Sequence, residues 1–111
     1  MKIGIDAMGG DFAPLECIKA VVSEANQQDN ELHFFLFGEE AALTPYASEL
    51  SHPNITVIHT GASIGMAEHA TKAVVAKKDS SINVGMLYLS EDKIDAFLSA
   101  GNTGAMMVSA L

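Results

Sequence analysis

Hydrophobic and polar positions alternate along the chain in a way that predicts strands and helices in turn. Short apolar runs at residues 1–5, 32–37, 55–58 and 94–98 predict four β-strands. After the first run, Leu15, Ile18, Val22 and Ala25 recur at helical spacing, which predicts an amphipathic helix to about residue 26. Further helices are expected at residues 67–78 and after Ser80 or Ser81, either of which can cap a helix. This alternation favours an α/β fold, a parallel sheet flanked by helices.

Polar residues and proline between these runs set the expected ends of the elements. Residues 32–37 are almost continuously apolar, which is typical of a strand buried on both faces of a parallel sheet. We expect Gly38 to end this strand and the acidic Glu39 to begin a helical stretch, where its charge suits the helix dipole. Pro45 interrupts that stretch, and Thr44 is a candidate N-cap for a separate turn.

The strand order decides where a ligand can bind. A doubly wound sheet has the default order 3-2-1-4, in which the first and fourth strands are neighbours. Ligands of such sheets bind beyond the carboxyl ends of the strands, where the order reverses. We expect one α/β domain over residues 1–111, with a modest core, and loops after the first and fourth strands that face each other.

Both of these loops contain glycines and lead toward a helical pattern. The first is Asp6-Ala7-Met8-Gly9-Gly10-Asp11, before Ala13-Pro14, and the second is Ser99-Ala100-Gly101-Asn102-Thr103-Gly104-Ala105. Glycine lets a ligand approach the main chain, and unpaired N–H groups at a helix start favour anions. Backbone amides around Met8, Gly9, Gly10, Gly101 and Gly104 are therefore candidate anion donors. The alternative is a pair of tight connections that bind nothing.

Polar side chains in the two loops have several possible roles. Asn102 and Thr103 offer side-chain donors to an anion, and helix capping is the alternative that uses the same atoms. Asp11 is expected to cap the first helix or tie down the loop. Asp6 either accepts hydrogen bonds from the opposite loop or holds a cation, since a carboxylate repels an anion.

Three motifs resemble the bacterial phosphate acyltransferases. They are the two loops above and Lys77-Lys78-Asp79-Ser80-Ser81, and the resemblance covers the whole chain. It implies transfer of a fatty acyl group from acyl-acyl-carrier-protein to inorganic phosphate, for phospholipid synthesis. It also implies a three-layer, isopropylmalate-dehydrogenase-like fold, no cofactor, and a cytoplasmic homodimer. Because family members are considerably longer, the chain is expected to be a truncated N-terminal part with little activity alone, and any membrane contact is expected in the remainder.

The implied reaction needs little from side chains. Phosphate is itself the nucleophile, so the protein must hold an anion against a thioester carbonyl and donate hydrogen bonds to the developing oxyanion. The glycine-loop amides, Asn102 and Thr103 are the expected contacts. His69 follows Glu68 at an expected helix start near the family's cleft, where it is a candidate general acid or phosphate ligand. A structural role is the alternative.

Charge narrows the choice of partner. The formal net charge of −8 argues against nucleic acid and is unfavourable for an acidic carrier protein. Lys72, Lys77 and Lys78 form the only basic cluster in the sequence and are candidate carrier contacts, or else an ordinary solvated helix end. The chain departs from the family here, since Ala70 and Val75 stand where members often carry proline and arginine.

Other functional classes have weaker support. The single Cys17 allows no internal disulfide, which fits a reducing compartment. It lies beside the buried face of the expected first helix, where a packing role is expected in preference to a reactive one. No cluster has metal-ligand spacing, so no structural metal is expected. A dinucleotide-binding domain is suggested by Glu39 after the second strand, but the first loop is not G-x-G-x-x-G. A non-catalytic binding or assembly segment is the remaining alternative.

Overall fold

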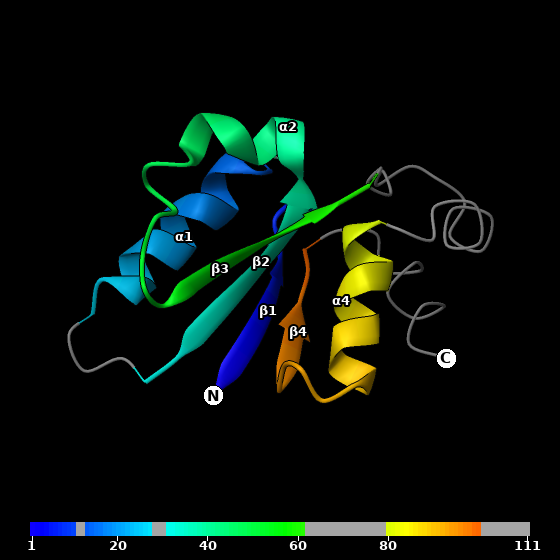
Figure 1. Cartoon of the computed structure of the whole chain (residues 1–111). Helices are drawn as coiled ribbons and strands as arrows, with labels where there is room; N and C mark the ends of the chain where they lie inside the picture. Colours follow the sequence, from blue (N-terminus) through cyan, green and yellow to red (C-terminus); the bar gives the residue numbers. More distant parts are fainter. Residues whose placement is uncertain (11–12, 28–30, 62–79, 101–111) are drawn as a thin grey trace.

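The computed structural model of the chain contains a four-stranded parallel sheet, and it describes residues 1–10, 13–27, 31–61 and 80–100. The strands are β1 (Lys2–Asp6), β2 (His33–Glu39), β3 (Ile55–Thr60) and β4 (Ala96–Leu98). The helices are α1 (Leu15–Ala25), α2 (Glu40–Leu43), the 3₁₀-helix η1 (Thr44–Tyr46) and α4 (Ser81–Ser90). The strand order is β3-β2-β1-β4 (Figure 1), so the expected α/β class and strand order are confirmed.

Strand β1 lies between β2 and β4. Its Ile3 is in register with Phe34 of β2 on one side and with Ala96 of β4 on the other. All three pairings are parallel, so every strand has its carboxyl end at the same edge of the sheet. The order reverses at β1, and its carboxyl end therefore lies at the position where doubly wound sheets bind ligands.

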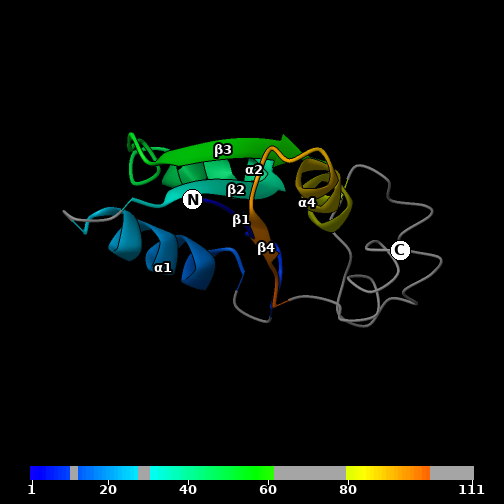
Figure 2. The ribbon, with the colours of Figure 1, turned by 90° about the horizontal axis from the view of Figure 1, so that it is seen from below.

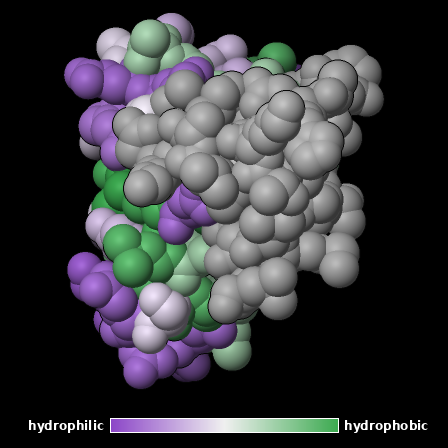
Figure 3. Space-filling model, turned by 90° about the vertical axis from the view of Figure 1, so that its right-hand side faces the viewer, coloured by the Kyte–Doolittle hydropathy of each residue, from purple (hydrophilic) through white to green (hydrophobic). Residues whose placement is uncertain are grey.

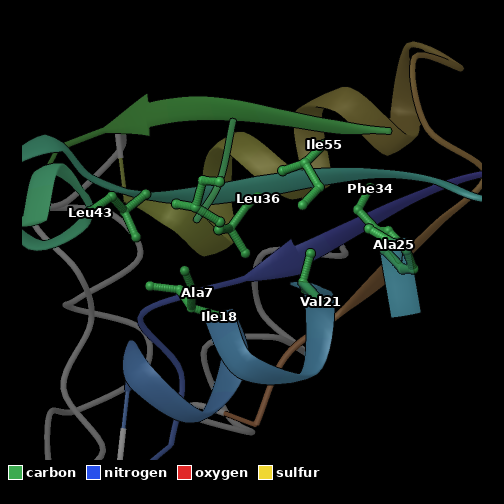
Figure 4. Packing of buried hydrophobic residues seen from close by; sticks show 9 residues of the cluster. Ala7, Ile18, Val21, Ala25, Phe34, Leu36, Leu43 and Ile55 are labelled. Carbon is green, nitrogen blue, oxygen red and sulfur yellow. The ribbon is translucent and has the colours of Figure 1, made fainter. Parts of the chain in front are cut away.

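Helix α1 covers one face of this sheet (Figures 1 and 2). Figure 4 shows Ile18 and Val21 of α1 packing toward Phe34 and Leu36 of β2. These two helix residues and Ala25 are buried, at spacings of three and four residues, as expected for a helix with one apolar face. The predicted apolar face was slightly displaced, because Leu15 is 39% exposed and Val22 is only partly buried.

A second cluster lies on the opposite face, under α4. Successive strand residues point to opposite faces, so Leu36 joins the α1 cluster while Phe37 packs with Ile94 and Phe97. The rings of Phe37 and Phe97 lie 5.7 Å apart, edge to face. The prediction that β2 is buried on both faces is confirmed, and helices lie on both sides of the sheet. The specific dehydrogenase-like layering remains a prediction.

Two predicted boundaries around β2 are wrong. The strand does not end at Gly38, because its pairing with β3 continues to Glu39 opposite Thr60. Glycine retains its backbone donor and acceptor, so it does not interrupt the ladder. Thr44 does not cap a separate turn, because its hydroxyl donates to the Glu40 carbonyl at 2.7 Å and η1 follows α2 directly.

Hydrophobic side chains also remain at the surface. Figure 3 views the molecule from the side on which α4 lies in Figure 1. In the described part of this face, a patch of hydrophobic residues is bordered by hydrophilic ones. Leu87 and Leu98 are 54% and 56% exposed. Within the described ranges, no helix has the length and apolar character needed to cross a bilayer.

Candidate functional site

A buried carboxylate stands at the carboxyl end of the central strand. Asp6 is only 2% exposed and is the last residue of β1, one position beyond the predicted end of this strand. Its Oδ1 accepts the Met8 backbone N–H at 2.9 Å and the Ser81 hydroxyl at 2.6 Å. Its Oδ2 accepts the Ser99 hydroxyl at 2.7 Å. One side chain thus joins the turn after β1, the first residue of α4 and the segment after β4.

Local sequence explains the Met8 bond and why the Ser81 hydroxyl is available for another. An aspartate that accepts the N–H two residues later forms an Asx-turn, which is how Asp6 holds Met8. The adjacent serines before and within α4 divide two tasks between them. Ser80 caps the helix by accepting the Asn83 N–H at 3.3 Å, as the sequence allowed, and this leaves Ser81 to donate to Asp6. Bonds from hydroxyls to a carboxylate are stronger than neutral ones.

The turn after β1 lies against the segment after β4. Gly10 has a φ of +92°, which is unfavourable for other residues. A Cβ built at Gly10 would lie 3.5 Å from the Ala100 Cβ and 3.9 Å from its carbonyl oxygen. The first glycine loop therefore lies beside the start of the second, at the edge of the sheet where β1 and β4 are neighbours (Figure 1).

Two of the candidate anion donors have partners inside the turn. The Met8 N–H donates to the Asp6 carboxylate, and the Gly9 N–H lies 3.4 Å from the Asp6 carbonyl oxygen. These bonds shape the turn, so anion binding by these two amides would compete with them. The role of Gly10 as a phosphate contact stays a prediction.

Several predicted site residues lie outside the described residues. They are Asp11, His69, Lys72, Lys77, Lys78, Gly101, Asn102, Thr103 and Gly104. The helix expected at residues 67–78 also lies outside the described ranges. Predictions about all of them stay predictions.

Sequence reasoning missed the roles of Ser81 and Ser99. Both serines belong to the motifs that carry the family resemblance, but neither had been given a partner. A signal was available, since an aspartate that ends a central strand is buried and needs donors. The local pattern did not reveal which donors, because Ser81 and Ser99 are 75 and 93 residues from Asp6.

Cys17 lies beside the same turn and is not set up as a nucleophile. Its Sγ is 3.6 Å from the Asp6 carbonyl oxygen and 3.9 Å from that of Gly9. Burial raises the pKa of the Cys17 thiol, and the negative charges of Asp6 and Glu16 raise it further. The thiol is therefore held in its protonated, weakly reactive form, which agrees with the packing role expected for it.

An apolar groove of about 580 Å³ runs between α1 and the strands β1 and β4. Ile5, Val21 and Leu98 contribute apolar walls, and Asp6 and Ser99 lie at the end near the glycine turn. Its volume is within the range of small-molecule sites, roughly 300–1,000 Å³. In the part of the chain that the structure describes, no group of three or more His, Cys, Asp or Glu side chains is placed to hold a metal ion.

Comparison with known proteins adds a family to this geometry. The family described as "Fatty acid synthesis protein" matches residues 1–111. The chain is 43% identical over 111 residues to a protein of Thermoanaerobacterium thermosaccharolyticum named "Phosphate acyltransferase". This chain is also 43% and 42% identical to proteins of the same name from Geobacillus sp. (strain WCH70) and Leuconostoc mesenteroides subsp. mesenteroides. Each comparison covers 100% of this chain and 32%, 33% and 32% of the respective relative.

The chain thus spans about a third of the length of these relatives. The aligned region extends over the whole chain. From its sequence, the chain belongs to the fatty acid synthesis protein family, and its curated relatives are named phosphate acyltransferases.

Proposed function

We propose that this chain is the N-terminal part of an enzyme that transfers a fatty acyl group from acyl-acyl-carrier-protein to inorganic phosphate. The name shared by the relatives supports acyl transfer to phosphate. The closeness of Gly10 to Ala100 is the structural observation that carries the proposal, because it places the first glycine loop beside the start of the second at the edge of the sheet where a ligand is expected.

The reaction requires one bond to form and one to break. A phosphate oxygen attacks the thioester carbonyl, and a new C–O bond gives a tetrahedral intermediate. Its collapse breaks the C–S bond and releases the carrier thiolate, which takes a proton from a general acid or from water. The products are acyl phosphate and the free carrier thiol.

The chain contributes positioning and hydrogen-bond donors in this proposal. Asn102, Thr103 and the amides of Gly10, Gly101 and Gly104 hold phosphate or the developing oxyanion. His69 is the candidate proton donor to the leaving thiolate. No step needs a cofactor or a metal ion.

The charge of the chain and its family support a proposal about its partner proteins. Lys72, Lys77 and Lys78 contact the acidic carrier, while the net charge of −8 means that most of the docking surface lies elsewhere in the enzyme. We propose a homodimer in the cytoplasm, with any membrane contact made by parts of the enzyme beyond this chain.

The test is an assay of acyl phosphate formation by the full-length enzyme, with acyl-acyl-carrier-protein and inorganic phosphate. In the Asn102→Ala variant we expect kcat/KM for phosphate to fall about 100-fold, because a donor to the phosphate or oxyanion is lost. Circular dichroism and the KM for the acyl donor are the controls for folding. An unchanged phosphate dependence contradicts the role of Asn102, and a folded wild-type enzyme that makes no acyl phosphate contradicts the function.

A dinucleotide-binding domain is the second candidate, because β2 ends at the acidic Glu39 next to the switch point. However, a dinucleotide fingerprint needs three spaced glycines, and the turn after β1 has two adjacent ones. Titration with nicotinamide dinucleotides distinguishes the candidates, and we expect no binding at millimolar concentration.

A further inference from the structure

We infer that Asp6 is a positioning residue which acts through Ser99 to fix the start of the second glycine loop, Ser99 and Ala100, against the first, while its bond to Ser81 only anchors α4. The inference rests on the proposed function, since it assigns a role within the same phosphate site. It gives Asp6 an indirect action on phosphate, through the hydrogen bonds that its carboxylate accepts.

Burial and charge both exclude Asp6 from direct contact with phosphate. Both of its carboxylate oxygens already accept hydrogen bonds, and the side chain is 2% exposed. A carboxylate also repels an anion at short range, and the repulsion increases in a poorly solvated site. Asp6 can therefore support phosphate binding only through the groups that it holds.

Ser99 is the group through which this support reaches the second loop. It follows Leu98, whose pairing with Ile5 is the last one between β1 and β4. Strand β4 has only three residues, so its backbone ladder alone fixes the direction of the outgoing chain weakly. The Ser99 hydroxyl binds Asp6, and the next residue, Ala100, lies beside Gly10.

Two successive residues of the second loop are thus held by one turn of the first. Asp6 also binds the Met8 N–H within that turn, so the same carboxylate shapes both sides of the contact. A shift of about 1 Å in catalytic groups is enough to lower rates about 100-fold. Loss of the Ser99 bond should therefore weaken phosphate use by more than its effect on stability suggests.

Ser81 provides a matched contrast. Its hydroxyl binds the same carboxylate at 2.6 Å, against 2.7 Å for Ser99, but it stands at the first residue of α4. This helix has two further anchors, the cap at Ser80 and the buried Ile82. Removal of the Ser81 hydroxyl should cost stability and leave both glycine loops in contact.

The experiment compares Ser99→Ala, Ser81→Ala and Ser99→Thr in the full-length enzyme. We expect Ser99→Ala to raise the KM for phosphate about tenfold, with the KM for the acyl donor changed less than about twofold. Ser81→Ala should leave the KM values for phosphate and for the acyl donor within about twofold of wild type. The midpoint of its denaturant unfolding should nevertheless fall as much as that of Ser99→Ala. Ser99→Thr keeps the hydroxyl and should restore the KM for phosphate to within about threefold of wild type.

The outcomes separate this inference from the proposed function. Equal changes in the KM for phosphate in the two alanine variants, or no restoration by Ser99→Thr, would overturn the positioning role while the enzyme remains a phosphate acyltransferase. A wild-type enzyme whose turnover does not depend on phosphate would instead overturn the proposed function.

Discussion

Strands β1 and β2 end side by side, and each ends in a carboxylate with a different environment. Asp6 of β1 is in register with Phe37 of β2, and Glu39 ends β2 two residues later. Asp6 is buried and accepts three hydrogen bonds from three segments. Glu39 is half-buried and serves as the N-cap residue of α2, where its side chain makes no capping bond.

The difference follows from what surrounds each strand end. Strand β2 leads directly into α2, so local chain covers its carboxyl end. Strand β1 lies where the strand order reverses, and the segment after β4 and the start of α4 both reach its carboxyl end. A carboxylate at the switch point therefore becomes a junction between distant segments, while one at the neighbouring strand end begins a helix.

The largest expected effect tests this contrast directly. Asp6→Ala removes the carboxylate that accepts three hydrogen bonds, and the buried Ser81 hydroxyl loses this acceptor. We therefore expect the free energy of unfolding to fall by about 3–5 kcal/mol. Glu39→Ala should cost less than about 1 kcal/mol. Urea unfolding of both variants measures the difference. Equal losses would mean that Asp6 is not a junction.

A methyl group added near the end of β1 or of β2 should destabilise the protein for different reasons. Gly10→Ala forces alanine to a φ of +92° and should cost about 1–2 kcal/mol. Gly38→Ala places a Cβ 2.9 Å from Leu43 Cδ1 and should cost about 1–3 kcal/mol by overpacking.

A double-mutant cycle distinguishes backbone strain from crowding. Leu43→Ala removes the nearest atom that the new methyl group meets, and Ala7 Cβ at 3.3 Å remains, so its combination with Gly38→Ala should cost less than the sum of the single effects. Ala100→Gly should give no such relief to Gly10→Ala, because the strain there lies in the backbone. Additivity in the first pair and coupling in the second would reverse this interpretation.

The smallest expected effect uses Cys17 to sense the charge at the end of β1. Burial and then the negative charges of Asp6 and Glu16 raise the pKa of its thiol, so alkylation by iodoacetamide should begin at a higher pH than for free cysteine. Asp6→Asn removes one charge and should move the pH profile of the rate to lower pH. Glu39→Gln should leave the profile unchanged, and a shift of equal size there would contradict the contrast.

The local pattern was sufficient for most of the fold. Short apolar runs, including the nearly continuous one at residues 32–37, identified the strands, and helical spacing identified α1. Errors occurred where neighbours decide the outcome. Gly38 continues β2 because β3 pairs with it, and Leu15 is partly exposed although it continues the apolar spacing.

The candidate site was predictable only in outline. The glycines and the strand order indicated two loops at one edge, and the closeness of Gly10 to Ala100 agrees with this. The choice between the two roles of Asp6, accepting hydrogen bonds or holding a cation, could not be made from the sequence. The structure shows hydrogen bonds from Ser81 and Ser99.

The sequence by itself determined the α/β class, the parallel strands and the presence of two glycine loops, because hydrophobic periodicity and turn chemistry act over a few residues. Only the tertiary structure decided which donors meet Asp6, since they come from 75 and 93 residues away. A buried carboxylate requires hydrogen-bond donors wherever the chain brings them, and no local pattern specifies their origin.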